Sequence, residues 1–298
     1  MAIDYRHGIS ILEIIIYSPT LFVALWMAFH HGFTKSSGWY FFVVFSLARI
    51  VGAACYLATI AAPSNVGLYI AWAVCTSLGL SPLILGCLGL LSRANDSIMR
   101  KTGDSINQIV FRFVVLVSLV GLILSIVGAT QNSDITHGLI TTETKVALVL
   151  FLVTWLAVCG ILVLIANQSH RIEQGEHRLL LAVAISLPLI LVRLVYSFVY
   201  AFGHLASFNM LSGNVTIQLV MSVLEEIVIV FVCLGVGLTL QVRPSLEDAQ
   251  PSSQIELESG ASQSQVLPKQ RSQRPKRSGG PITRLVMFIV DEINERRK

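Results

Sequence analysis

Two carboxylates, Glu225 and Glu226, stand side by side inside an apolar run over 215–240. A charged side chain near the centre of a membrane costs about 2.5–3.5 kcal/mol on insertion scales. An acid in that position either keeps its proton, and can then act as a general acid, or pairs with a buried base. The pair is therefore a candidate for acid chemistry or for ion pairing inside the protein.

Arg49 and Arg193, in two other apolar runs, are the candidate partners of the acids. At about 1.5 Å per helical residue, both arginines and both acids reach depths that agree within roughly 6 Å. Together they would form a neutral set. Because consecutive helical residues point about 100° apart, we expect one glutamate to face Arg193 and the other to face Arg49.

Further polar residues recur at helical spacing on the same runs. Gln218 and Ser222 precede Glu225 on one helical face of the last run, and we expect such faces to converge on a polar cavity. An arginine released from its glutamate could hold a carboxylate there. The candidate ligand-binding or ion-pair residues are Arg49, Arg193, Glu225, Glu226, Glu13, Tyr17, Gln218 and Tyr200.

Membrane-spanning helices must position these residues. The chain of 298 residues is 54% hydrophobic and only 13% charged, whereas a soluble domain is about 25% charged. Stretches of about 20 apolar residues cross a bilayer as helices, because lipid cannot satisfy an open backbone. We predict an all-α, polytopic bundle in 1–242, with Pro19, Pro82 and Pro188 bending its first, third and sixth spans. The seven predicted spans are 8–30, 39–61, 67–91, 110–129, 144–166, 179–203 and 215–240.

Basic residues are distributed unequally between the two ends of the predicted bundle. One set of loops carries Lys35, Arg93, Arg100, Lys101, Arg171 and Arg178, and the other end carries only Arg6 and Lys145. Positive residues favour the cytoplasmic side. We therefore predict the N-terminus outside and the C-terminus in the cytoplasm. The pattern fits the plasma membrane and endomembranes equally, and Asn214 is the single glycosylation sequon on the predicted outer side.

The chain beyond the last span has a different composition. Residues 243–280 are rich in Ser, Gln and Pro, contain a basic cluster over 269–278, and are predicted to be disordered. Residues 281–298 predict an amphipathic helix. The expected partners are the lipid bilayer itself and, at this tail, anionic lipid headgroups or a cytoplasmic protein. No nucleic acid partner is predicted.

Metal and cofactor chemistry find little support in the sequence. His170, Glu173 and His177 have suitable types for a metal, but they fall in a short polar loop that reads better as solvated charge. The five cysteines all lie within predicted spans, so no disulfide framework is expected. We predict no metal site, no cofactor and no catalytic residue.

Several sequence blocks resemble a family. HHGFTKSSGW (30–39), FSLARIVGA (45–53), LGLSPLILGCLGLLSR (78–93), LPLILVRLVYS (187–197) and FNMLSGN (208–214) before VLEE (223–226) resemble a seven-span membrane family of unknown function from filamentous fungi. The resemblance covers about residues 5–242. It implies a fungal membrane protein, and it transfers no catalytic residue.

Three functions remain open from the sequence. The first is sensing or transport of a small polar or anionic molecule at the buried Arg/Glu cluster; a faint repeat between 46–56 and 190–200 favours transport, and the long tail favours signalling. The second is an intramembrane enzyme, such as a terpene-cyclase-like protein, that uses a buried glutamate as general acid. The third is a structural or assembly protein in which the buried charges only hold the helices in register with one another. The residues favour binding over catalysis.

Overall fold

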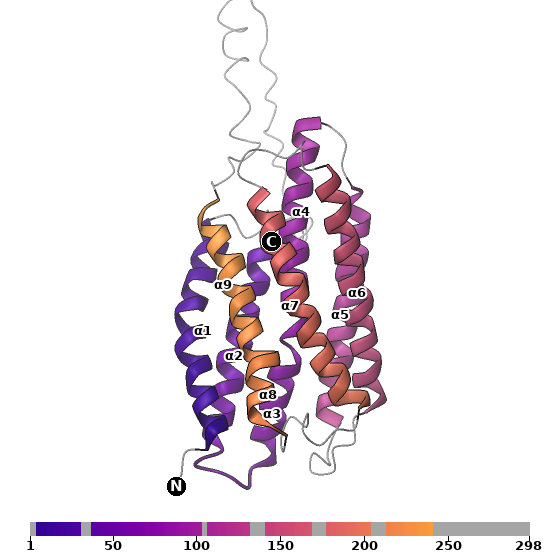
Figure 1. Ribbon diagram of the computed structural model, residues 1–298. Helices are drawn as coiled ribbons and strands as arrows, with labels where there is room; N and C mark the ends of the chain where they lie inside the picture. Colours follow the sequence, from indigo (N-terminus) through magenta and orange to yellow (C-terminus); the bar gives the residue numbers. More distant parts are fainter. Residues whose placement is uncertain are drawn as a thin grey trace, which may run out of the picture. The chain divides into compact units, whose positions relative to one another are not determined.

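The computed structural model describes residues 4–30, 37–102, 106–131, 141–168, 177–203 and 213–240. These residues are helical apart from short turns and helix ends, as the composition predicts. The predicted tail over 243–280, the predicted helix over 281–298, His170 and Glu173 lie outside the described residues. The helices run up and down in one bundle (Figure 1). They are α1 Tyr5–His30, α2 Ser37–Ala58, α3 Val66–Ser77, α4 Leu80–Thr102, α5 Gln108–Gln131, α6 Thr142–Asn167, α7 His177–Phe202, α8 Val215–Gln218, the π-helix η4 Leu219–Leu224 and α9 Glu225–Leu238.

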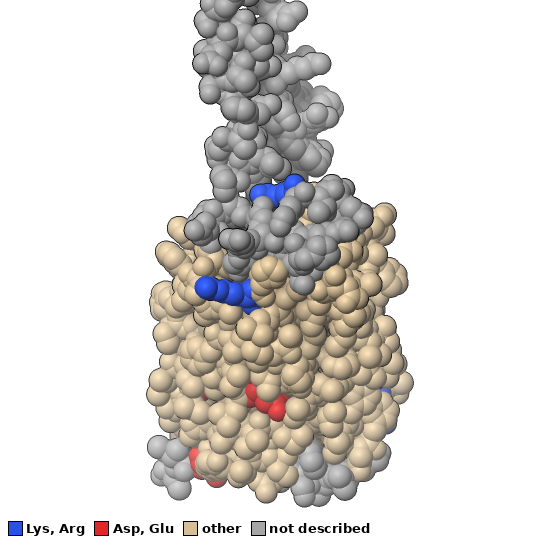
Figure 2. All heavy atoms as spheres, turned by 45° about the horizontal axis from the view of Figure 1, so that its top comes forward, with Lys and Arg blue, Asp and Glu red and all other residues tan. Residues whose placement is uncertain are grey.

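Within these described ranges, seven helical segments are long and apolar enough to cross a membrane, with mean hydropathies between 1.9 and 3.0. Large apolar side chains point outward from them; Phe22 is 71% exposed and Phe113 67%. Few charged atoms interrupt the described surface on the face seen in Figure 2. These features indicate a multi-pass membrane protein. Its orientation in the membrane remains a prediction.

The third predicted span consists of two helices in the structure. α3 ends at Ser77, residues Leu78 and Gly79 form a turn, and α4 begins at Leu80. Proline is tolerated in the first turn of a helix, where its missing N–H has no intrahelical partner to lose. Pro82 occupies that turn of α4, so the interruption precedes the proline rather than bending the helix at it. Pro19 and Pro188 lie inside α1 and α7, and that they bend these helices stays a prediction.

α4 forms the centre of the bundle. It packs against α2, α5, α6 and α7, and every residue from 80 to 88 is buried. α9 lies beside α7 and also contacts α1 (Figure 1). This packing brings α1, α2, α7 and α9 around one interior.

The last span departs from α-helical geometry over Leu219–Leu224, where it is a π-helix. A π-helical turn holds an extra residue, because its hydrogen bonds run from i to i+5. The faces before and after the turn are therefore offset by one position. Gln218, Ser222 and Glu226 are buried on a common face, whereas Glu225 is only half-buried. The predicted stripe was wrong in its last member, because it assumed α-helical spacing throughout.

Candidate functional site

Glu226 is the centre of the buried charges. Its side chain is 0% exposed and forms ion pairs with two arginines. Arg193 Nε on α7 donates to Glu226 Oε1 at 3.0 Å, and Arg49 Nη2 on α2 contacts Glu226 Oε2. The two arginine side chains are only 3% and 4% exposed. We predicted that Glu225 and Glu226 would each pair with one arginine. Instead, the single carboxylate of Glu226 links α9 to both α2 and α7.

Glu13 on α1 completes the set. Arg49 Nη1 lies 3.4 Å from Glu13 Oε1, and the Glu13 side chain is 6% exposed. Arg49, Arg193, Glu13 and Glu226, called here the ion-pair cluster, come from four helices and sum to zero formal charge. The prediction of a neutral set of two arginines and two glutamates is confirmed in its charges, but Glu13 takes the place assigned to Glu225.

Glu225 lies beside the ion-pair cluster rather than in it. Leu224 and Val228 near it are 42% and 44% exposed. Its buried Oε2 atom has no hydrogen-bond partner among the described residues. The expectation that each acid faces one arginine is wrong, because the π-helix turns Glu226 inward and leaves Glu225 near the outer surface of α9.

The break between α3 and α4 lies against the ion-pair cluster. Arg193 Nη2 donates to the backbone oxygen of Thr76 at 3.3 Å, and Arg193 Nη1 donates to Ser197 Oγ at 2.9 Å. A Cβ atom on Gly79 would stand 2.9 Å from Arg49 Nη2 and 3.0 Å from Glu226 Oε1. Glycine is thus the residue that lets the turn approach the ion pairs so closely.

Aromatic rings surround the arginines. The Arg49 guanidinium carbon lies 5.6 Å from the Phe45 ring centroid, and Arg193 lies 5.6 Å from that of Tyr196. Both distances suit cation–π attraction. Tyr17 meets Phe45 edge-on at 5.5 Å between centroids, is fully buried, and its hydroxyl has no hydrogen-bond partner within the described ranges. Glu13 and Tyr17, both predicted site residues, are buried in α1 four residues apart.

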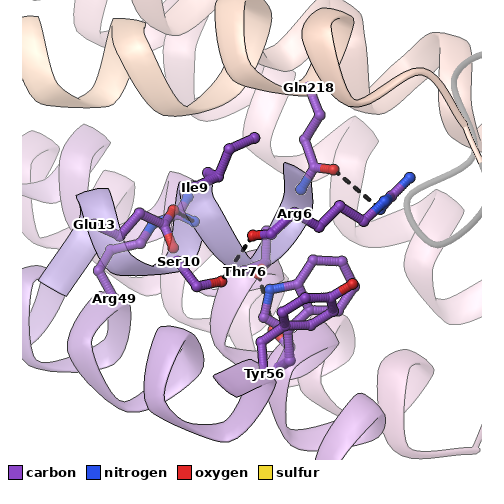
Figure 3. Close-up of a pocket in the computed structure, with 9 residues that line it drawn as sticks. Arg6, Ile9, Ser10, Glu13, Arg49, Tyr56, Thr76 and Gln218 are labelled. Carbon is purple, nitrogen blue, oxygen red and sulfur yellow. Dashed lines mark hydrogen bonds and ion pairs between the residues drawn. The ribbon is translucent and has the colours of Figure 1, made fainter. Parts of the chain in front are cut away.

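A small polar cavity leads to the Arg49 side of the cluster (Figure 3). Its volume of about 10 Å³ is close to the room that one water needs. Arg6 Nη1 donates to Gln218 Oε1 at 3.3 Å and Arg6 Nη2 to the Gly213 oxygen at 2.8 Å. We call this small polar cavity the Arg6 cavity. Its polar lining comprises Arg6, Ser10, Glu13, Arg49, Tyr56, Thr76 and Gln218.

Arg6 was missed as a site residue, because the sequence analysis counted it only as a loop charge. A signal was present, since Arg6 precedes Glu13 by about two helical turns and so shares its face. Gln218 was a predicted site residue, and it lies in the Arg6 cavity. Arg6 and Gln218 thereby extend the polar interior from the ion-pair cluster toward the start of α1 and α8.

A second cavity adjoins the Arg193 side of the cluster. It has a volume of about 60 Å³. We call it the Arg193 cavity. Tyr200, expected with the other candidates, lines this cavity rather than contacting the ion pairs. Its polar lining comprises Ser77, Ser125, Thr144, Arg193, Tyr196, Ser197 and Tyr200. The eight candidates thus fall into the ion-pair cluster, the two cavities and, for Tyr17 and Glu225, positions beside the cluster.

Residues 3–243 match the family described as Domain of unknown function (DUF7702). This match covers most of the 298 residues. The chain belongs to the DUF7702 family. No curated protein and no solved structure matches it. The match takes in every described helix of this DUF7702 chain, and so it also takes in the ion-pair cluster and both cavities.

The chemistry open to this DUF7702 chain follows from its side chains. No group of three or more His, Cys, Asp or Glu residues that could hold a metal ion occurs among the residues that the structure describes. The five cysteines are free. The ion-pair cluster offers guanidinium donors and carboxylate acceptors in a buried interior, where such hydrogen bonds are stronger than in water.

Proposed function

We propose that this chain is a fungal membrane protein that senses or transports a small polar or anionic molecule through the ion-pair cluster. The observation that carries the proposal is the coincidence of Arg49, Arg193 and Glu226 with two helix irregularities. Gly79 interrupts one span and η4 distorts another at the same place. In membrane transporters, interrupted helices commonly form the substrate site, and π-helical turns are frequent at functional sites.

The Arg6 and Arg193 cavities support the same proposal. Each lies against one arginine of the ion-pair cluster. A polar molecule in the Arg193 cavity, or one admitted to the Arg6 cavity when the bundle opens, would meet a guanidinium whose carboxylate partner it could displace in part. A purely structural ion pair needs no adjoining polar space, so the cavities favour binding over a static bond between helices.

Reconstitution of the purified full chain tests the proposal. Pools of radiolabelled amino acids, sugars, polyols and organic acids are offered to proteoliposomes for uptake, and to the same protein in nanodiscs for thermal stabilisation. We expect one chemical class to accumulate or to raise the melting temperature. Gln218→Leu should weaken that response, because Gln218 lines the Arg6 cavity, whereas Glu225→Gln outside it should not. If no class binds or crosses the membrane, the cluster is a structural bond and the proposal fails.

A second candidate, an intramembrane enzyme, draws on Glu225. Glu225 is half-buried between exposed apolar residues on a membrane helix, where a lipid-soluble substrate could receive the proton of its carboxyl. Incubation of the proteoliposomes with isoprenoid and lipid substrates, followed by mass spectrometry, checks this function. A new product that disappears in Glu225→Gln would favour the enzyme, and unchanged substrates would remove it.

A further inference from the structure

The Arg193 cavity is lined by five helices, from α3 to α7, and among the residues that the structure describes its lining contains one charged residue, Arg193. Glu226, which pairs with Arg193, is not part of that lining. An occupant of the cavity would therefore touch a guanidinium directly, while the carboxylate that neutralises it lies behind it. We infer that the Arg193 cavity is a binding site for a short-chain monocarboxylate. This inference rests on the proposed function, because it names the class of molecule that the site would take.

Arg193 has donors left for such an anion. A guanidinium carries about five N–H groups in a planar fork. In the described part of the chain, Arg193 donates from Nε to Glu226, from Nη1 to Ser197 and from Nη2 to Thr76. Each Nη atom thus keeps a further N–H. Two N–H groups from adjacent nitrogens are the arrangement that binds a carboxylate through both oxygens.

The rest of the cavity suits a short alkyl group. Leu80, Leu148 and Phe151 line it, together with the hydroxyl-bearing Ser125 and Tyr200. Its volume of about 60 Å³ is well under the roughly 150 Å³ of a protein cavity that admits benzene. Acetate and propionate are smaller than benzene, and they are the largest carboxylates that we expect the cavity to admit. A phosphate or sulfate ion would bring a second charge against apolar walls, so a monoanion is preferred.

Binding of radiolabelled propionate to the full chain in nanodiscs tests the inference, in chloride buffer of constant ionic strength. We expect saturable binding that acetate competes for, and that hexanoate and the neutral isostere propionamide do not. Leu148→Phe fills the apolar part of the cavity without touching an ion pair and should weaken binding about tenfold or more. Leu164→Phe, on the exposed side of the same helix, is the matched control and should leave binding unchanged.

Three results would overturn the inference: no saturable binding, equal competition by propionamide, or full binding in Leu148→Phe. Competition by acetate, hexanoate and propionamide tests the inference in the native chain even if the Leu148→Phe variant fails to fold. If one of these three results is found while a different polar molecule is still taken up in a way that Gln218→Leu weakens, only this site is removed and the proposed function stands. The opposite result is also possible: propionate binds in the Arg193 cavity, but Gln218→Leu changes neither transport nor thermal stabilisation by any class of molecule. That result would support this site and exclude the proposed role of the Arg6 cavity.

Discussion

At the scale of single residues, Glu226 and Glu225 are the same residue type in adjacent positions with different surroundings. Glu226 is fully buried and contacts Arg49 and Arg193, whereas Glu225 is half-buried and outside the ion pairs. Removing the negative charge of Glu226 would leave both arginines without their shared acid. Breaking one side of a buried ion pair is costly because the remaining charge stays desolvated.

We expect Glu226→Gln to lower the free energy of unfolding by about 3 to 5 kcal/mol. Glu225→Gln removes the same charge one position earlier and should change stability by less than about 1 kcal/mol. Thermal unfolding of both variants in matched detergent micelles checks the difference. Equal effects of the two substitutions would show that Glu226 does not hold the arginines as the geometry indicates.

At the scale of elements, the α3–α4 break and the π-helix decide which side chains meet. The break had sequence signals, because Gly79, Ser81 and Pro82 are turn and helix-start residues. The π-helix over 219–224 had none, since LVMSVL reads as an ordinary apolar segment. Periodicity could therefore predict that Arg49 and Arg193 meet an acid of the last span. It could not predict which acid, because it assumes about 100° per residue.

The break supplies a prediction at the same scale. Gly79→Ala places a methyl group against Arg49 and Glu226 and should destabilise the fold by about 1–3 kcal/mol, as overpacking does. Gly235→Ala is the control, because a Cβ there meets nothing within 4 Å, and alanine favours a helix by up to about 1 kcal/mol. Thermal unfolding of the two variants measures both effects. A stable Gly79→Ala protein would mean that the ion pairs have room to move apart.

At the scale of the whole molecule, hydropathy predicted the seven membrane-length helices and α-helix as the structural class. It did so because lipid exposure forces each span to satisfy its own backbone and to present apolar side chains outward. The interior was harder to predict. Glu13 reaches Arg49 through the packing of α1 beside α2, and Arg6 reaches Gln218 on α8. No local pattern encodes these contacts. The predicted orientation of the bundle in the membrane depends on loop charges alone.

Cysteine labelling in sealed microsomes checks the orientation. Gln108, exposed at the start of α5, is predicted to face the cytoplasm, and Ser64, exposed in the turn after α2, is predicted to face the lumen. Gln108→Cys should react with a membrane-impermeant maleimide in intact vesicles, whereas Ser64→Cys should react only after detergent is added. The native chain, whose cysteines lie within spans, provides the blank. The reverse labelling pattern would show that the bundle has the opposite orientation in the membrane.

The extra residue in 219–224 also affects how this chain is compared with its relatives. A DUF7702 protein without the π-helical turn would carry its inward acid one position closer to the glutamine equivalent to Gln218. An alignment that matches glutamates by column alone would then equate the outer carboxyl of one protein with the inner carboxyl of another. In this span, counting helical turns from Gln218 identifies the corresponding acid more safely than counting residues does.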